Sequence, residues 1–277
     1  MIIIDYSAIA ISNIVTQKLD IQEDMIRHMI LNSIRMYRAK FKDKFGEVIM
    51  TGDAGNNWRY NEFPQYKAAR KKNRKESKMD WQEAFRIINL VWEELGEHFP
   101  YKTIKIDGCE ADDVIAVLAT RYAASQKVMI LSSDKDFAQL QKFPNVEQYS
   151  PILKKFIKEP LPSAQLKQLV IRGDKSDGIP NILSKDDTFV EGVRQKPITE
   201  AKIINWMNQS PEEFCTDEML RNFKRNEMLI DLTRIPEALK ETILHTYEEA
   251  KGKTKQEFMN YIITNRLKNL LEVIDEF

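Results

Sequence analysis

Short hydrophobic runs that stop at acidic residues recur along the first part of this chain. Runs such as Ile2–Ile4 and Val128–Leu131 are apolar on both faces, and segments with helical periodicity separate them, which predicts a parallel α/β sheet. The carboxyl ends of parallel strands meet at one edge of a sheet, so acids placed there converge on one crevice. The acidic groups are Asp5; Asp53; Glu110, Asp112 and Asp113; Asp134 and Asp136; and Asp174 and Asp177.

Converging carboxylates repel one another strongly unless cations neutralise them. Carboxylate oxygens are the ligands that hard divalent metals prefer, and magnesium fits this set best. The acidic series therefore predicts a divalent metal centre at the carboxyl edge of the sheet.

The order of the predicted elements indicates two parts. We expect strands over Ile2–Ile4, Glu47–Met50, Tyr101–Ile106, Val128–Leu131 and Val146–Tyr149. Helices are expected between the strands, with Asp80 as the N-cap of one of them. Strand signals fade after about Ser163. We therefore expect an α/β core over residues 1–162, with a basic segment at 57–80, and a mainly helical part over residues 163–277.

Composition narrows the class of protein. The chain has 277 residues, is 43% hydrophobic and has a formal net charge of zero, so it can bury a core and is not uniformly basic. Its two cysteines lie in no metal-binding spacing, which argues against zinc and against a structural disulfide. No signal peptide or membrane span is apparent, and a cytoplasmic location is expected.

Each acidic motif also has a plainer interpretation. Asp112 and Asp113 suit the first turn of a helix, because its dipole favours negative charge. Asp134 and Asp136 suit an ordinary turn, and the Asp174 motif suits a surface loop. Asp5 is harder to explain in this way, because a buried carboxylate needs a partner or a metal; the plainer alternative is a hydrogen-bonded strand end.

A basic segment lies between the second and third acidic groups. Lys67 and Arg70 are one helical turn apart, and aromatic residues are interleaved with the charges, as in segments that stack bases and grip phosphates. In most proteins such a run would be a solvated surface. Because it has almost no apolar face, residues 66–80 are expected to be mobile without nucleic acid. The candidate nucleic-acid contacts are Trp58, Arg59, Tyr66, Lys67, Arg70, Lys71, Lys72, Arg74 and Lys75.

Taken together, these motifs resemble the flap endonuclease and 5′→3′ exonuclease family, whose core is a PIN-like domain. The acidic series matches that family group by group, and Pro64-Gln-Tyr66-Lys67-Ala-Ala-Arg70 resembles its helical arch. Within the family, Trp58-Arg59 and the ending Glu276-Phe277 are similar to the branch found in T-even-type bacteriophages. The resemblance covers nearly the whole chain and is densest over residues 1–180.

The resemblance implies two magnesium ions, which manganese could replace. The first would be held by Asp5, Asp53, Glu110, Asp112 and Asp134, with Asp113 close by. The second would be held by Asp136, Asp174 and Asp177, with Asp134 between the two. The arch would supply Lys67 and Arg70 to the scissile phosphate and Tyr66 as a stacking ring. Lys67, Arg70 and Asp134 are thus the expected catalytic residues.

The implied activity is 5′→3′ exonucleolytic cleavage, with ribonuclease H and flap endonuclease activity, that removes RNA primers and adjacent DNA in lagging-strand replication. The expected substrate is a DNA or RNA/DNA duplex with a 5′ end, nick or flap, acted on by a monomer that meets a single-strand-binding protein or sliding clamp. Two alternatives are a PIN-domain endoribonuclease and a non-catalytic protein that binds branched DNA. In the host cytoplasm, a phage protein of this kind would work on replicating DNA.

The sequence departs from the family after Asp177. Residues 181–197 stand where many relatives have a glycine-rich helical hairpin that binds duplex backbone and potassium. A mobile loop is one interpretation of this segment, and its binding of DNA or potassium is left open. From charge alone, the candidates for duplex contact are Lys185, Arg194, Lys196 and Lys202.

Overall fold

The computed structural model describes residues 1–15 and 21–277, with the side chains of 71–73 and 75 left aside. The chain forms two compact units. The first, here the sheet unit, comprises Met1–Gly55, Asp80–Lys158 and Glu237–Phe277. The second, here the helical unit, comprises Asn56–Met79 and Glu159–Pro236. The sequence predicts two consecutive parts that meet between residues 162 and 163, and this boundary stays a prediction. The two compact units are instead each built from segments that are separated along the chain.

The sheet unit contains a six-stranded sheet of order β3-β2-β1-β4-β5-β6. All neighbouring strands are parallel except β5 and β6, which confirms the predicted parallel α/β core and adds an antiparallel edge strand that sequence reasoning missed. The strands are β1 Ile2–Asp5, β2 Val48–Thr51, β3 Lys102–Ile104, β4 Val128–Leu131, β5 Val146–Ser150 and β6 Lys155–Ile157.

The register aligns the carboxyl ends of the central strands. Ile4 of β1 pairs with Met50 of β2 and with Leu131 of β4, and Asp5 pairs with Thr51. The side chains of β1, β2 and β4 are buried throughout, as expected of strands covered on both faces. Residues that follow these strands therefore start from the same edge of the sheet.

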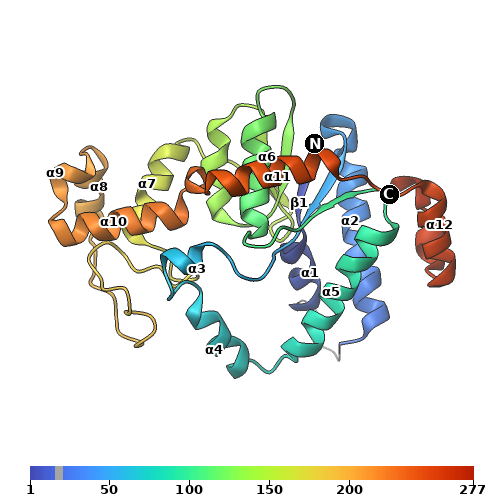
Figure 1. The fold of residues 1–277 in the computed structure, drawn as a ribbon, viewed down its shortest axis with the longest axis horizontal. Coiled ribbons are helices and arrows are strands. Elements are labelled where there is room, and N and C mark those ends of the chain that lie inside the picture. Colours follow the sequence, from blue (N-terminus) through green and yellow to red (C-terminus); the bar gives the residue numbers. More distant parts are fainter. Residues whose placement is uncertain (16–20) are drawn as a thin grey trace. The chain divides into compact units, whose positions relative to one another are not determined.

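Helices pack around this sheet in two groups (Figure 1). The helices α1, α2 and α5 contact one another, and α6 contacts α11 as well as β1 and β4. Asp80 caps α5 by accepting a hydrogen bond from the Glu83 N–H at 3.0 Å, as predicted. The helices of the unit are α1 Tyr6–Val15, α2 Glu23–Phe45, α5 Trp81–His98, α6 Ala111–Tyr122, α11 Glu237–Glu249, α12 Lys255–Thr264 and α13 Lys268–Leu271, with 3₁₀ turns at Lys135–Lys142 and Ile274–Glu276.

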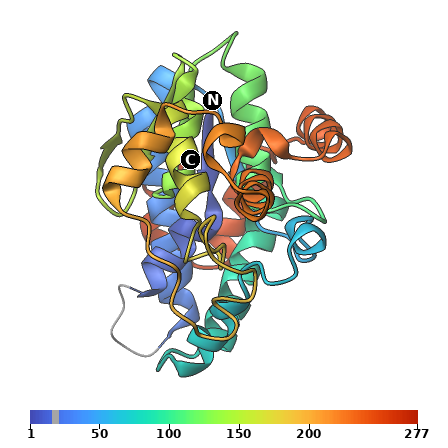
Figure 2. The ribbon, with the colours of Figure 1, turned by 90° about the vertical axis from the view of Figure 1, so that its left-hand side faces the viewer.

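The helical unit has its own hydrophobic core. Helix α7 packs against α8 and α10, and α10 also contacts α9 and α3 (Figures 1 and 2). Phe63 and Tyr66 belong to this core together with Ile171 and Leu229. The helices are α3 Arg59–Glu62, α4 Ala68–Glu76, α7 Pro162–Arg172, α8 Glu200–Met207, α9 Pro211–Phe214 and α10 Asp217–Ile230, with a 3₁₀ turn at Leu232–Arg234.

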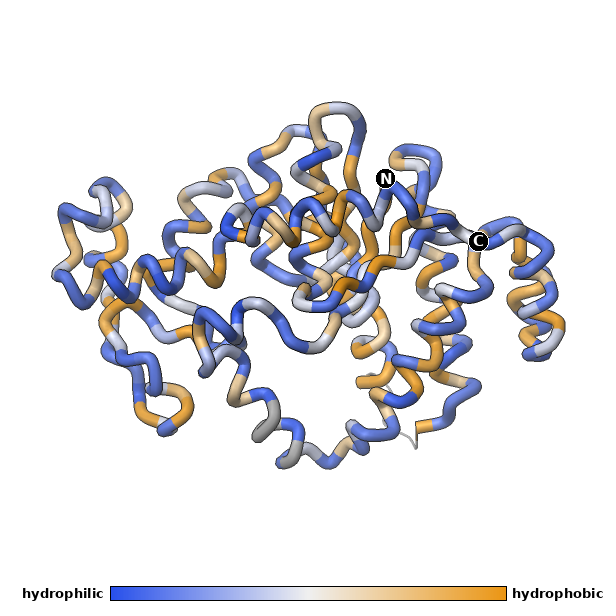
Figure 3. The backbone as a smooth tube through the Cα atoms, in the orientation of Figure 1, coloured by the Kyte–Doolittle hydropathy of each residue, from blue (hydrophilic) through white to orange (hydrophobic). Residues whose placement is uncertain are grey.

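The basic segment is helical over α4. After its two alanines, the residues of α4 that Figure 3 colours are hydrophilic, as the sequence predicts for a segment without an apolar face. The expected mobility of residues 66–80 concerns motion and stays a prediction. Among the described residues, no helix is long and apolar enough to cross a membrane.

Candidate functional site

Asp5 is the last residue of the central strand β1. Its carboxylate is buried, with 8% of the residue exposed, and both oxygens accept hydrogen bonds. The N–H of Ala8, in the first turn of α1, donates to Oδ1 at 3.0 Å. The hydroxyl of Ser132, directly after β4, donates to Oδ2 at 2.9 Å. Sequence reasoning missed Ser132, although a polar residue directly after a buried strand lies at the same edge of the sheet as Asp5.

The electrostatic surroundings of Asp5 are negative. Burial raises the pKa of Asp5 to about 7, the Asp53 carboxylate acts in the same direction, and Asp134 adds to the rise, while the hydrogen bonds from Ala8 and Ser132 oppose it. The charged groups that act on Asp5 are thus both carboxylates. The structure therefore brings Asp53 and Asp134 within electrostatic reach of Asp5, as the strand-end pattern predicts.

The N-terminus of α6 faces Asp53. The Ala111 N–H donates to Asp53 Oδ1 at 3.0 Å, so the first turn of α6 and the segment after β2 meet. Asp113 is fully buried and accepts from the Glu110 N–H at 2.9 Å, in a capping box formed with the Glu110 side chain. The plainer interpretation of Asp113 therefore accounts for its burial, and Glu110 and the half-buried Asp112 remain the candidate metal ligands of this turn.

Asp134 and Asp136 follow β4 at the same edge. Asp134 is exposed, and its Oδ1 accepts from the Asp136 N–H at 2.9 Å. The buried Gln148 of β5 holds this turn by donating to the carbonyl oxygens of Ser132 at 3.1 Å and Asp134 at 2.6 Å. Sequence reasoning missed Gln148, which is a polar residue inside a short strand. Its amide fixes the backbone from which Asp134 projects.

These side chains suit a hard cation by their chemistry. They are carboxylates at one strand edge, and the buried Asp5 is under the electrostatic influence of two further carboxylates. Among the described residues, no three acidic, histidine or cysteine side chains are already grouped as a metal shell. The oxygens of Asp5, Asp53 and Asp134 instead accept hydrogen bonds from backbone N–H groups and from Ser132, with which a cation would compete.

In the helical unit, Asp174 lies in a tight turn. Gly173 has a φ of +67°, and a Cβ there would lie 2.3 Å from the Ile179 carbonyl oxygen, so only glycine fits. Asp174 is buried and its Oδ1 accepts from both the N–H and the hydroxyl of Ser176, at 2.7 and 2.6 Å. The segment for which a surface loop was the plainer interpretation is therefore a closed turn held by hydrogen bonds.

Asp177 forms ion pairs with the predicted arch cations. Lys67 Nζ lies 3.6 Å from its Oδ2 and Arg70 Nη2 lies 2.5 Å from its Oδ1. The Tyr66 hydroxyl donates to Oδ2 at 3.0 Å, and the Lys67 N–H donates to the Asp177 carbonyl oxygen at 2.7 Å. Lys67 itself adopts a left-handed φ of +55°, which is uncommon outside glycine and typical of functional or strained positions.

Several predicted nucleic-acid contacts are part of the core. Trp58, Arg59 and Tyr66 have exposed fractions of 7%, 2% and 2%. The Arg59 guanidinium lies 4.5 Å from the Trp58 ring and donates to the Leu229 carbonyl oxygen at 3.0 Å. Burial favours a packing role for these three residues over stacking on bases. Arg70 and Arg74 are exposed, and the side chains of Lys71, Lys72 and Lys75 lie outside the described residues.

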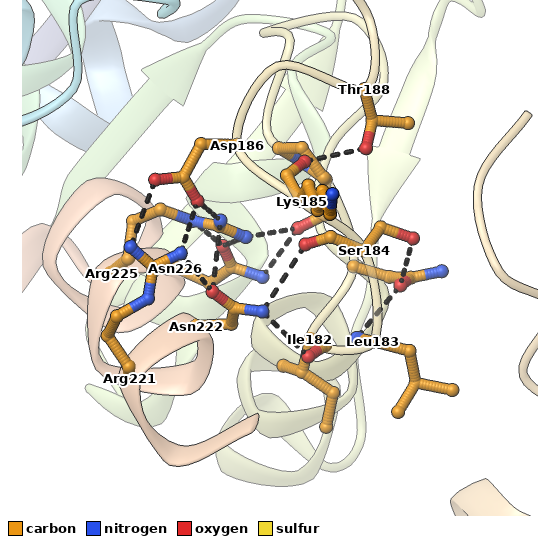
Figure 4. Close-up of polar contacts among 12 residues, drawn as sticks. Ile182, Leu183, Ser184, Lys185, Asp186, Thr188, Arg221, Asn222, Arg225 and Asn226 are labelled. Carbon is orange, nitrogen blue, oxygen red and sulfur yellow. Dashed lines mark hydrogen bonds and ion pairs between the residues drawn. The ribbon is translucent and has the colours of Figure 1, made fainter. Parts of the chain in front are cut away.

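The first half of residues 181–197 is connected to α10 by hydrogen bonds and ion pairs (Figure 4). Asn222, 1% exposed, donates to the carbonyl oxygens of Ile182 and Ser184 at 3.0 and 3.3 Å. Arg221 and Arg225 both pair with Asp186. This network could not be predicted from the sequence, because its partners are far apart along the chain. These bonds connect this half to α10, while its predicted mobility concerns motion and stays a prediction.

The second half of this segment borders a basic cavity of about 680 Å³. Arg194 and Lys196, two of the four residues singled out for duplex contact, line it together with Arg172 and Lys175, and none of the described residues that line it is acidic. Arg172 also pairs with Glu200 at 2.6 Å. Lys185 and Lys202 are not among its lining residues.

The fold and these residues define a nuclease of the 5′→3′ exonuclease class. The family described as "5′-3′ exonuclease, N-terminal resolvase-like domain" matches residues 1–167, and that described as "T4 RNase H, C terminal" matches residues 162–277. The chain belongs to the 5′-3′ exonuclease family, and it is an enzyme of the exonuclease and flap endonuclease kind.

Among curated proteins, the chain is 33% identical to ribonuclease H of Enterobacteria phage T4 over 290 residues, covering 99% of this chain and 95% of that protein. It is 27% identical to flap endonuclease Xni of Vibrio cholerae, covering 64% of this chain and 65% of the relative. The solved structure of the T5 D15 protein with metal ions shares its fold, with a TM-score of 0.63, 16% identity, and coverage of 88% of this chain and 98% of that one. The family and phage branch predicted from the motifs are confirmed.

Proposed function

We propose that this nuclease uses two divalent metal ions, magnesium in the cell, to hydrolyse phosphodiester bonds at 5′ ends. Its task would be to remove RNA primers and adjacent DNA during lagging-strand replication. The substrate would be a DNA or RNA/DNA duplex with a 5′ end, nick or flap. The relatives named ribonuclease H and flap endonuclease support this reading, as does the T5 flap endonuclease solved with DNA and metal ions.

The burial of Asp5 among carboxylates is the observation on which the proposal rests. A carboxylate that is buried beside Asp53 and Asp134, without a basic side chain among the groups that shift its pKa, is unfavourable in a protein that binds no cation. The arrangement becomes favourable when a divalent ion shares the charge. A purely structural acid would be better placed beside a lysine or arginine.

The first ion would be held by Asp5, Asp53, Glu110, Asp112 and Asp134. The second set predicted, Asp136 with Asp174 and Asp177, remains a proposal. When bound, such ions would supply acidified water and neutralise charge on the phosphate being cut. Ser132 and Gln148 would keep Asp5 and the Asp134 turn in position.

Lys67 and Arg70 would stabilise the charge that develops on the phosphoryl oxygens. Both are paired with Asp177 in this structure. A phosphate would therefore have to exchange with Asp177 as their anionic partner, and Asp177 would become available to a metal ion at the same time. This exchange would couple substrate binding to completion of the metal site.

The basic cavity beside residues 189–198 would contact the sugar–phosphate backbone of the duplex. Among the described residues that line it, four are cationic and none is acidic, so it would attract phosphate without reading sequence. We further propose that the enzyme works as a monomer in the host cytoplasm and meets a single-strand-binding protein or sliding clamp at the fork.

Replacement of Asp134 by Asn tests the proposal. Asn keeps the size of the side chain and can still accept from the Asp136 N–H, so folding should be preserved. On a 5′-labelled flap or nicked duplex with magnesium, cleavage should fall by about 10³-fold or more, since a metal ligand is lost, while binding of the duplex is retained. Asp217→Asn, at an exposed residue of α10 in the helical unit, is the matched control and should cut normally.

Magnesium-dependent cleavage by Asp134→Asn at the wild-type rate would refute the metal assignment. Cleavage of single-stranded RNA at internal sites, with no preference for a 5′ end, would instead favour an endoribonuclease. Binding of branched DNA by the wild-type protein without any cleavage would point to a non-catalytic member of the family.

A further inference from the structure

The indole of Trp92 contacts the residues that directly follow two neighbouring strands of the sheet. Trp92 is half-buried on α5 of the sheet unit. Its six-membered ring lies against Gly52, which stands between the end of β2 and Asp53. A Cβ on Gly52 would lie only 2.9 to 3.0 Å from three atoms of this ring. The ring therefore rests directly on the backbone that leads into Asp53, and glycine is the residue that permits this approach.

The same indole also packs on Tyr6, which follows Asp5 at the end of β1. The centroids of the two rings are 5.2 Å apart, with an interplanar angle of 54°. Tyr6 is 2% exposed, and its hydroxyl donates to the carbonyl oxygen of Ile88 at 2.6 Å. Ile88 lies one turn before Trp92 on α5, so this helix holds Tyr6 through a hydrogen bond and through a ring contact. One side chain thus contacts the chain neighbours of both Asp5 and Asp53.

Hydrogen bonds tie the strands together just before the two acids. The Thr51 hydroxyl, which is fully buried, donates to the Ile4 carbonyl oxygen at 2.9 Å and so joins β2 to β1. The Gly52 N–H donates to the Ile104 carbonyl oxygen at 3.0 Å. The strand ends are therefore in a fixed register, and Trp92 adds the contact that connects the residues directly outside the strands.

The like charges of the two acids give such a contact a purpose. The Asp5 and Asp53 carboxylates repel each other, so the chain needs a support that holds them in place before a cation is bound. Packing of a large neutral ring provides this support, because its strength does not depend on charge. The indole N–H can only donate a hydrogen bond, so Trp92 is no ligand for a metal ion. Misplacement of the ligands by a fraction of an ångström is enough to weaken a metal site.

We propose that Trp92 is a positioning residue, which sets the spacing of Asp5 and Asp53 and thereby the affinity of the first metal site for a divalent ion. The inference rests on the proposed function, in which both carboxylates hold that ion. It deepens this function by assigning part of the metal affinity to a side chain that supplies no ligand atom. A phenyl ring is shorter than an indole, so phenylalanine would leave Gly52 and Tyr6 without their common support.

Titration of the full-length, metal-free protein with manganese tests the role of Trp92 without turnover. The electron paramagnetic resonance signal of the free ion measures the affinity, and the first metal site is identified as the one that Asp5→Asn abolishes. We expect Trp92→Phe to weaken this site about tenfold, as the loss of an outer support does. Trp206→Phe, on α8 of the helical unit, is the matched control. Its indole stacks on Phe214 with the ring centroids 5.2 Å apart, and its replacement should leave the affinity unchanged.

Two negative results of this titration have different meanings. A wild-type protein that binds no manganese would overturn the proposed function and the role of Trp92 with it. Wild-type binding together with equally tight binding by Trp92→Phe would overturn the role of Trp92 alone. Thermal unfolding in the absence of metal shows whether each variant is folded.

A pair of substitutions gives a second measurement. Gly52→Ala places a methyl group where the ring of Trp92 lies, so the ring must move, and the metal affinity should fall as it does in Trp92→Phe. In the double variant, the shorter phenyl ring leaves room for that methyl group, and the affinity should be higher than in either single variant. A merely structural role would leave the metal affinity of the folded variants unchanged. Losses that multiply in the double variant would overturn the proposal.

Discussion

Asp5 of the sheet unit and Asp177 of the helical unit are both predicted metal ligands. They differ in whether nearby basic side chains compensate their negative charge. Asp5 receives hydrogen bonds from the neutral donors of Ala8 and Ser132, and the charged groups that act on it are carboxylates. Asp177 is paired with Lys67 and Arg70 and also accepts from Tyr66. One carboxylate is left with its charge uncompensated, and the other is neutralised by the chain itself.

The difference indicates two ways of keeping a metal ligand in a folded protein. At Asp5, the cost of a buried negative charge lowers stability until a cation arrives. At Asp177, the ion pairs with Lys67 and Arg70 offset the cost of the partly buried negative charge. In the proposed reaction these two side chains bind the phosphate, so they must first leave Asp177. We expect substitutions at the two carboxylates to change stability in opposite directions.

Joint replacement of Lys67 and Arg70 by Ala should lower catalysis strongly and so tests the role of the arch. Loss of the groups that offset charge on the phosphoryl oxygens should lower the turnover of a 5′-flap substrate by about 100-fold or more. Single-turnover kinetics at saturating enzyme would separate this loss from weaker binding. Arg121→Ala with Lys127→Ala removes the same charge from exposed positions of the sheet unit and should leave turnover nearly unchanged. Normal turnover by the Lys67 and Arg70 variant would remove the arch from the mechanism.

Replacement of Asp5 by Asn should stabilise the metal-free protein while it abolishes activity. The folded pKa of Asp5 is raised, so the folded state loses stability as pH rises from the ordinary aspartate value of 3.8 to about 7. Asn carries no such penalty. In EDTA at pH 8, the free energy of unfolding should increase by something on the order of 2 kcal/mol, and the gain should vanish toward pH 4. Denaturant titrations at both pH values measure it.

Two further observations sharpen this prediction. Addition of magnesium should stabilise the wild type and not the variant, so the gain should shrink or reverse. Asp43→Asn, at an exposed residue of α2, should show no such dependence on pH or on metal. An Asp5→Asn protein that is less stable than the wild type in EDTA at pH 8 would show that the charge of Asp5 is already compensated.

The parts of the site that follow from strand ends could be predicted from the sequence. A buried run that stops at an acid, such as Ile2–Ile4 before Asp5, fixes both the strand and the edge at which the acid lies. The same reasoning located Asp53 and Asp134, because parallel strands share one carboxyl edge. Sequence reasoning missed the antiparallel strand β6, Lys155–Ile157. It has only three residues and none of them is buried, so it shows no pattern of hydrophobic residues typical of a strand.

Roles that depend on contacts between distant segments could not be predicted in this way. Trp58, Arg59 and Tyr66 have the composition of a base-stacking segment, and only their burial shows that they pack in the helical unit. Likewise, the resemblance to the family predicts that Lys67 and Arg70 contact phosphate. It does not predict that they pair with Asp177, which lies more than 100 residues away along the chain. Asp113 was ambiguous, and the capping box explains it.

Replacement of Asp177 by Asn should have the smallest effect on stability and the opposite sign to that at Asp5. Asn can still accept from the Tyr66 hydroxyl but loses the ion pairs with Lys67 and Arg70, whose side chains are 10% and 44% exposed. The free energy of unfolding in EDTA should fall by about 1 kcal/mol, and the loss should be smaller in high salt because salt screens the pairs in the wild type. Asp43→Asn is again the control. If Asp177→Asn were to stabilise the metal-free protein as Asp5→Asn does, then Lys67 and Arg70 would not compensate its charge, and the proposed exchange between Asp177 and the phosphate would lose its basis.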